Sequence, residues 1–201
     1  MALLQAVTIG LAALALSPGW LFYFDVTPKI VILLVGTAVA LFCTGRTPRW
    51  FSFLILGSLL SLTISTALSS NPALSLYGTN WRRFGAVTQA AVLLFAWTVA
   101  KHAAGDPIRV RTILRGVSIA SGLIAAYGIA QYFGWDPILP AAAYHVGEGV
   151  WTIVRPPGTL GYVSYFANWL VLAAFLALAQ AAVETSTRWR TFALSLSLIH
   201  I

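Results

Sequence analysis

Two groups of arginines precede apolar segments and have the chemistry to bind a phosphate. Arg82 and Arg83 lie just before the apolar segment 86–100, and Arg155 lies just before the segment 162–183. A guanidinium group is planar and permanently charged, and it grips a phosphate through two parallel hydrogen bonds. A helix N-terminus adds free N–H groups and the positive end of its dipole. We therefore predict that these arginines converge on one phosphate-bearing ligand; isolated arginines at lipid headgroups are the alternative.

The turn that carries the third arginine has a constrained backbone. It reads VRPPGTLGYVSYFAN over residues 154–168, so Pro156 and Pro157 fix the backbone directly after the arginine. Gly158 and Gly161 permit left-handed or closely packed conformations. The glycines do not form a P-loop, because no Lys-Ser or Lys-Thr pair follows them. The pattern favours a built binding turn, and an ordinary loop-to-helix connection is the alternative.

A group-transfer reaction would also need a base, and the loop 134–161 offers three titratable residues. His145 has the pKa range suited to this work, although a solvated loop histidine is the commoner case. Glu148 lies in a Gly-Glu-Gly sequence that is typical of a solvated turn. Asp136 precedes a proline and is typical of a turn former or helix cap. The catalytic base is therefore left unassigned, with His145 as the weak candidate.

The composition indicates what kind of element positions these groups. Of 201 residues, 59% are hydrophobic and only 8% are charged, whereas soluble domains carry about 25% charged residues. The mean hydropathy is +0.85, and the apolar residues form separate segments joined by short polar stretches. We therefore expect an all-α, polytopic helical membrane protein. The net charge of +7 is spread over the connecting loops, which argues against a nucleic-acid partner.

Six complete membrane spans and the start of a seventh are expected. The first two are short for a hydrocarbon core of about 30 Å. No Lys or Arg precedes the first apolar segment, so we expect a retained span rather than a cleaved signal peptide. The predicted complete spans cover residues 2–16, 29–43, 50–68, 86–100, 116–133 and 162–183, and the seventh begins at residue 191.

The loops between these spans differ in charge, which predicts the orientation. Alternate loops hold eight basic residues on one side and four on the other. Because cytoplasmic loops are rich in Lys and Arg, the larger set and the N-terminus are expected in the cytoplasm. Loops 69–85 and 134–161 then face outward. The larger set is Arg46, Arg49, Lys101, Arg109, Arg111, Arg115, Arg188 and Arg190; the smaller set is Lys29, Arg82, Arg83 and Arg155.

The end of the chain carries a separate expectation. Residues 196–201 read LSLIHI, which equals a translation of the transposon end sequence used in sequencing-library preparation. We expect these six residues to be non-native read-through. Residues 1–195 are then expected to form one transmembrane helical domain, the N-terminal part of a longer protein.

Three segments of the chain form a series of spaced motifs. They read SSNPALSLYGTNWRRFG (69–85), YGIAQYFGWDP (127–137) and RPPGTLGYVSYFANWL (155–170). In order and spacing they resemble the O-antigen ligase and polysaccharide polymerase family of bacterial membrane proteins. The chain departs from that family at 162–164, where Tyr-Val-Ser stands for Asn-Pro-Asn, although Asn168 supplies an amide one turn later. The positions that fit are Arg83, Gly85, Gln131, Asp136, Pro137, Arg155, Thr159, Gly161 and Ala167.

The resemblance implies a glycosyltransferase at the outer face of the bacterial inner membrane. Such an enzyme moves a glycan from a polyprenyl-diphosphate carrier to a glycan, lipid or protein acceptor. Positioned arginines stabilise the departing diphosphate without a metal or cofactor, which implies diphosphate binding by Arg82, Arg83 and Arg155. The base is implied to be a histidine of a later outer loop, beyond residue 201. The implied supporting residues are Gly158, Thr159, Gly161 and Asn168.

Other functions stay open at this stage. A repeat-unit polymerase of the same family shares these motifs. A polysaccharide or lipid transporter is disfavoured, because none of the six complete spans holds an Asp, Glu, Lys, Arg or His in its interior. A non-catalytic assembly protein would tolerate loss of the outer arginines.

Overall fold

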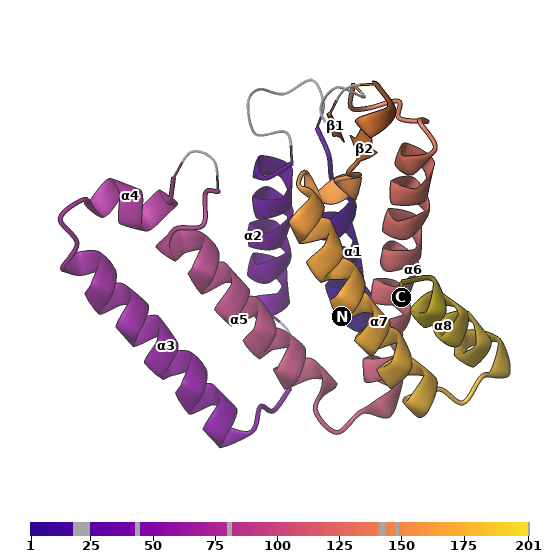
Figure 1. Ribbon diagram of the computed structural model, residues 1–201. Helices are drawn as coiled ribbons and strands as arrows, with labels where there is room; N and C mark the ends of the chain where they lie inside the picture. Colours follow the sequence, from indigo (N-terminus) through magenta and orange to yellow (C-terminus); the bar gives the residue numbers. More distant parts are fainter. Residues whose placement is uncertain (18–24, 43–44, 80–81, 141–143, 148, 201) are drawn as a thin grey trace.

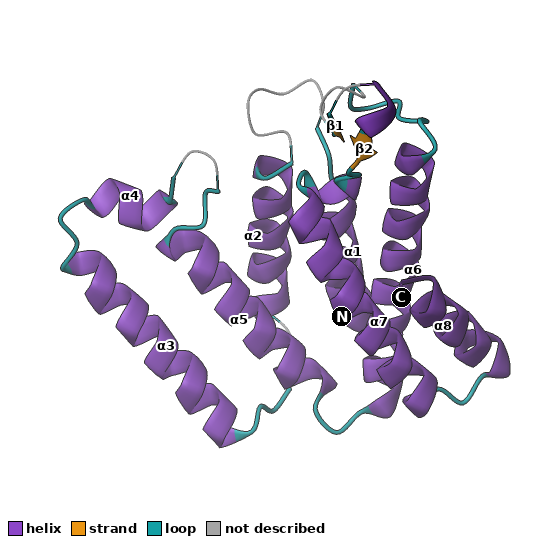
Figure 2. Ribbon diagram, in the orientation of Figure 1, coloured by secondary structure: helices purple, strands orange, loops and turns teal. Residues whose placement is uncertain are grey.

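The computed structural model describes residues 1–17, 25–42, 45–79, 82–140, 144–147 and 149–200. Helices dominate these residues, which confirms the all-α class (Figures 1 and 2). The helices are α1 (Ala2–Leu14), α2 (Thr27–Leu41), α3 (Arg49–Ala67), α4 (Pro72–Tyr77), α5 (Ala86–Ala103), α6 (Pro107–Tyr132), α7 (Val163–Val183) and α8 (Thr187–His200).

The connection between α6 and α7 contains a small hairpin. Strand β1 (His145–Val146) pairs antiparallel with β2 (Ile153–Val154), and His145 lies opposite Val154. Two short 3₁₀ helices, η3 (Gly149–Trp151) and η4 (Gly158–Leu160), complete this connection. The hairpin brings the segment before α7 back over the end of α6.

The number of membrane spans is confirmed only in part. Each predicted span contains a helix, but among the described residues only α3, α6 and α7 are long and apolar enough to cross a membrane. Helices α1 and α2 have 13 and 15 residues, fewer than the roughly 20 that a perpendicular span needs. Helix α5 has 18 residues, and its last turn carries Lys101 and His102, which shorten its apolar part.

Several predicted boundaries are wrong. Residues 101–115 were expected to form a loop, but α5 continues to Ala103 and α6 already begins at Pro107. The carboxylate of Asp106 caps α6 by accepting hydrogen bonds from the N–H groups of Ile108 and Arg109, and proline suits the first position of a helix. Helix α8 likewise begins at Thr187 rather than at residue 191.

Helices α1 and α6 pack closely at the centre of the bundle. Small residues permit this approach: a Cβ atom added to Gly116 would lie 2.6 Å from the Cβ of Ala6, and one on Gly10 would lie 3.4 Å from that of Ala120. Helix α2 packs against α1 and α5, and α7 packs against α6 and α8. Helix α3 lies at the edge and contacts α5 and α4 (Figure 1).

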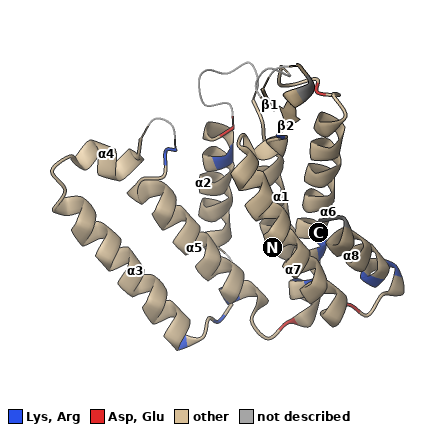
Figure 3. Ribbon diagram, viewed as in Figure 1, with Lys and Arg blue, Asp and Glu red and all other residues tan. Residues whose placement is uncertain are grey.

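The basic residues divide between the two ends of the bundle (Figure 3). The α3–α5 and α6–α7 connections lie at one end, which we call the turn end. The α2–α3, α5–α6 and α7–α8 connections lie at the other, which we call the basic end (Figure 1). The alternation of loops predicted from the sequence is therefore present in the fold. By their positions in the chain, the four cations of the smaller set lie in or near the connections of the turn end, and the eight of the larger set lie in or near those of the basic end.

Candidate functional site

The turn before α7 is built around two glycines with positive φ angles. Gly158 opens η4 with φ = 58°, and Gly161 ends it with φ = 78°, a conformation that disfavours side-chain-bearing residues. The backbone N–H of Arg155 donates to the Tyr144 carbonyl at 2.9 Å and so extends the β1–β2 pairing. The Arg155 side chain is exposed.

The buried amide of Gln131 holds this turn against α6. Its Oε1 accepts a hydrogen bond from the backbone N–H of Gly158 at 2.9 Å, and its Nε2 donates to Asp136 at 2.8 Å. A side chain on Gly158 or on Gly128 would overlap the ring of Phe166, so both glycines are required for close packing. The motif at 127–137 and the motif at 155–170 are thus in direct contact.

Asp136 collects four hydrogen bonds at the end of α6. Its Oδ1 accepts from the Tyr127 hydroxyl at 2.7 Å and from the backbone N–H groups of Ile138 and Leu139 at 2.9 Å. Burial disfavours the carboxylate, but these bonds and the one from Gln131 outweigh it, so the pKa of Asp136 lies below its usual value. The interpretation of Asp136 as a turn former is confirmed.

Lys29 ties the same turn to the end of α1, and sequence reasoning missed this role. Its ammonium group donates to the carbonyl of Thr159 at 2.8 Å, of Ala15 at 2.9 Å and of Ala13 at 3.2 Å. The buried hydroxyl of Thr159 also donates to the Ala13 carbonyl, at 2.7 Å. Lysine therefore satisfies carbonyls that the C-terminus of α1 leaves without helical partners. The only sequence signal was a cation placed at the start of an apolar segment.

A cavity of about 450 Å³ lies beside this turn, between α1, α2, α5 and α7. Its wall includes the charged residues Asp25, Lys29 and Arg82. The Nε1 of Trp169 is buried and has no hydrogen-bond partner among the described residues, and this tryptophan lines the cavity. A side chain on Gly161 would collide with the carboxylate of Asp25. Most of the remaining lining is apolar, with Thr8, Thr88 and Tyr165 as the polar exceptions, so the cavity suits an amphiphile with acceptor atoms in its headgroup.

The three predicted arginines do not share this cavity. Arg82 lines it, whereas Arg83 lines a second cavity of about 430 Å³ between α2 and the α4–α5 connection, and Arg155 lines neither. Arg83 has φ = 45°, and this backbone conformation directs the side chains of Arg82 and Arg83 to different sides of the turn. The backbone of Gly85 packs on that of Gly78, where a side chain on either would collide with the other's backbone. The motif glycines thus shape the turn that separates the arginines.

The remaining predicted residues lie outside the cavity. Asn168 is exposed on α7. His145 is half-buried in β1; its Nε2 has no hydrogen-bond partner among the described residues, and its ring makes a T-shaped contact with that of Tyr144. Glu148 lies outside the described residues. Tyr162, which stands for the first asparagine of the family pattern, is the N-cap of α7 and makes no side-chain cap.

Replacing Gln131 with leucine is expected to lower the free energy of unfolding by about 2 kcal/mol, because the buried Gly158 N–H and the Asp136 carboxylate each lose a partner. Denaturation in detergent measures this change. Gln89→Leu is the matched control, since Gln89 donates one exposed hydrogen bond to the Phe84 carbonyl. Equal stability losses in the two variants would contradict the conclusion that Gln131 holds the turn against α6.

Comparison of the chain with protein-family models, curated proteins and solved structures finds no match. The functional assignment therefore depends on the residues and geometry described above.

Proposed function

We propose that this chain is the N-terminal part of an O-antigen ligase-like glycosyltransferase of the bacterial inner membrane. The enzyme transfers a glycan from a polyprenyl-diphosphate carrier to an acceptor hydroxyl at the outer face. The observation that supports this is the contact between separate motifs: Gln131 holds Gly158, and Lys29 holds Thr159 beside a cavity that Arg82 also lines. A repeat-unit polymerase uses the same kind of donor, so the acceptor distinguishes the two activities.

The proposed topology has α1, α2, α3, α5, α6 and α7 crossing the membrane, with the N-terminus in the cytoplasm. Support comes from the division of basic residues, since eight belong to the basic end and four to the turn end. A tilted hairpin, or local thinning of the bilayer, accommodates the short α1 and α2. The cavity at the turn end is then open to a donor on the periplasmic side.

The cavity offers a physical basis for binding the donor. Arg82 and Lys29 place positive charge where a diphosphate gains negative charge as the glycan departs. The indole N–H of Trp169 is a further donor for a phosphate oxygen. Apolar residues of the same wall, Leu33 and Phe95 among them, suit the first units of the polyprenyl chain. The catalytic base stays unassigned: the resemblance implies a histidine of a later outer loop, and His145 is the weak candidate in this chain.

Undecaprenyl diphosphate is expected to bind the chain in lipid nanodiscs, and Arg82→Gln is expected to weaken this binding by roughly tenfold or more. The reason is the loss of a charge-assisted hydrogen bond, worth about 1.5–3 kcal/mol. Titration followed by mass spectrometry of the bound lipid provides the measurement. Arg83→Gln and Arg155→Gln test whether all three arginines bind the diphosphate. If both variants weaken binding, loss of Arg83 or Arg155 in the complete enzyme is expected to abolish glycan transfer.

The matched control is Arg46→Gln, which removes an exposed arginine at the opposite end of the bundle. It is expected to leave binding unchanged. If Arg82→Gln, Arg83→Gln and Arg155→Gln all bound undecaprenyl diphosphate as tightly as the parent chain, the diphosphate assignment would be wrong.

A further inference from the structure

A second apolar cavity lies along the seam between α1 and α6, on a different face of α1 from the first cavity. It has a volume of about 390 Å³ and a floor of small residues, Ala6, Gly10, Gly116 and Ala120. Large apolar side chains flank this floor, and Leu3, Leu11 and Leu123 expose more than half of their surface. We call this cavity the α1–α6 furrow. Small residues form its floor and large apolar side chains form its walls, so the furrow suits one hydrocarbon chain.

The length of the furrow fits one acyl chain of a phospholipid. Its α1 wall extends from Leu3 to Leu14, which corresponds to roughly 16 Å of helix. Half of a hydrocarbon core is roughly 15 Å thick. One acyl chain, which spans about one leaflet, is therefore long enough to lie along the whole furrow, because α1 is itself short.

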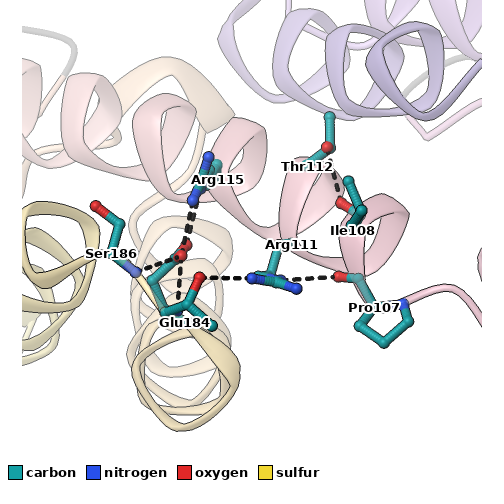
Figure 4. A network of polar contacts seen from close by, with 8 residues as sticks. Pro107, Ile108, Arg111, Thr112, Arg115, Glu184 and Ser186 are labelled. Carbon is teal, nitrogen blue, oxygen red and sulfur yellow. Dashed lines mark hydrogen bonds and ion pairs between the residues drawn. The ribbon is translucent and has the colours of Figure 1, made fainter.

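The basic end of the furrow is polar. Arg115 and Trp189 line it there, and the guanidinium carbon of Arg115 lies 4.9 Å from the centre of the Trp189 ring. The Nε and Nη2 atoms of Arg115 bind Glu184 at 2.8 and 2.7 Å, and the arginine side chain is still 33% exposed (Figure 4). Arg111 reaches the same junction, where its Nη1 donates to the Thr185 hydroxyl at 2.7 Å. A single carboxylate thus stands among several guanidinium groups.

Arg188 and Arg190 add charge on either side of Trp189. Both are exposed in the first turn of α8. Cations near a helix N-terminus oppose the helix dipole, so the stability of α8 does not account for them. With Arg111 and Arg115 they bring four positive charges to a junction that holds the single negative charge of Glu184. The junction is therefore complementary to an anionic headgroup.

We propose that the furrow binds an anionic phospholipid, with one acyl chain between α1 and α6 and the headgroup at Arg111, Arg188 and Arg190. A second copy of the chain is a less suitable occupant. In one bilayer it would have the same orientation and would place its own four arginines beside these, which like-charge repulsion disfavours. The headgroup part of this site lies at the basic end, and the furrow lies on a different face of α1 from the cavity proposed for the glycan donor, so the site does not depend on that function.

The test is competition between dioleoyl-phosphatidylglycerol and dioleoyl-phosphatidylcholine for the purified chain, read by native mass spectrometry. The parent chain is expected to retain phosphatidylglycerol preferentially. The double variant Arg188→Gln/Arg190→Gln is expected to lose this preference by roughly fivefold or more, from the contribution of an arginine at an anionic membrane surface. Val7→Trp fills the furrow from its exposed wall and is expected to lose the retained lipid altogether.

Two matched controls separate this site from general membrane attraction. Arg46→Gln/Arg49→Gln removes the same charge at the same end of the bundle, near α3, and is expected to keep the preference within twofold. Leu172→Trp adds the same bulk to an exposed position of α7, outside the furrow. An equal loss of preference in both charge variants would overturn the proposal. So would retained lipid in Val7→Trp, or a lipid-free dimer that Val7→Trp dissociates.

Discussion

Replacing Glu184 with glutamine is expected to lower the free energy of unfolding by about 3 kcal/mol. The Glu184 side chain is fully buried and accepts two hydrogen bonds from Arg115 (Figure 4). Its Oε1 also accepts from the backbone N–H groups of Thr185 at 2.9 Å and Ser186 at 3.1 Å. Removing one partner of a buried ion pair costs about 3–5 kcal/mol, and the partial exposure of Arg115 places this pair at the lower end.

The same pair predicts how stability depends on pH. The hydrogen bonds from Arg115 lower the pKa of Glu184 from 4.5 to about 2, against the opposing effect of burial and with help from the two backbone N–H groups. Because the folded-state pKa is depressed, this stabilisation is complete above about pH 4.5 and is lost as the pH falls towards 2. Denaturation in detergent between pH 6 and 2.5 measures how steeply the free energy of unfolding falls with pH, which we call the acid slope.

The control for this prediction is Asp106→Asn. Asp106 pairs with Arg109 at 2.8 Å on the surface, where both side chains are more than a third exposed, and asparagine preserves the helix cap. We expect this variant to lose less than about 1 kcal/mol and to keep the acid slope of the parent chain. An unchanged acid slope in Glu184→Gln would show that other carboxylates determine it.

The positions of the long helices along the chain were predictable because the apolar segments are distinct, but their lengths were not. The sequence rule that charged residues belong to loops placed Arg109, Arg111 and Arg115 in a connector. In the structure they lie on the first turns of α6, since Asp106 and Pro107 start the helix earlier. An arginine can occupy a helix near the membrane surface because its long side chain extends to the headgroups. Charge alone therefore does not mark the end of a helix.

The candidate site was predictable where it consists of spaced motifs and unpredictable where it depends on backbone atoms. Gln131, Asp136 and Gly158 belong to motifs that sequence reasoning singled out, and they are in contact. The separation of Arg82 from Arg83 follows from a positive φ angle at Arg83, which no periodicity encodes. The role of Lys29 depends on carbonyl groups up to 130 residues away, and a carbonyl has no sequence signature.

Replacing Lys29 with methionine is expected to lower the free energy of unfolding by about 3 kcal/mol. Methionine keeps much of the length of the side chain but donates no hydrogen bond, so the carbonyls of Ala15 and Thr159 lose their ammonium partner. A hydrogen bond to a charged group contributes about 1.5–3 kcal/mol, and the three bonds of one ammonium are not additive. Lys101→Met is the matched control, because Lys101 lies over the Trp97 ring at the basic end.

The effect of Lys29→Met on ligand binding decides whether this lysine only supports the fold. The turn that it holds contributes Leu160 to the cavity and presents Gly161 to Asp25. Release of the turn is therefore expected to weaken the binding of undecaprenyl diphosphate by more than tenfold, measured well below the unfolding temperature. Lys29→Arg keeps the charge and is expected to recover part of this affinity if the charge faces the ligand. If Lys29→Met bound as tightly as the parent chain while losing stability, Lys29 would be a structural anchor that takes no part in the site.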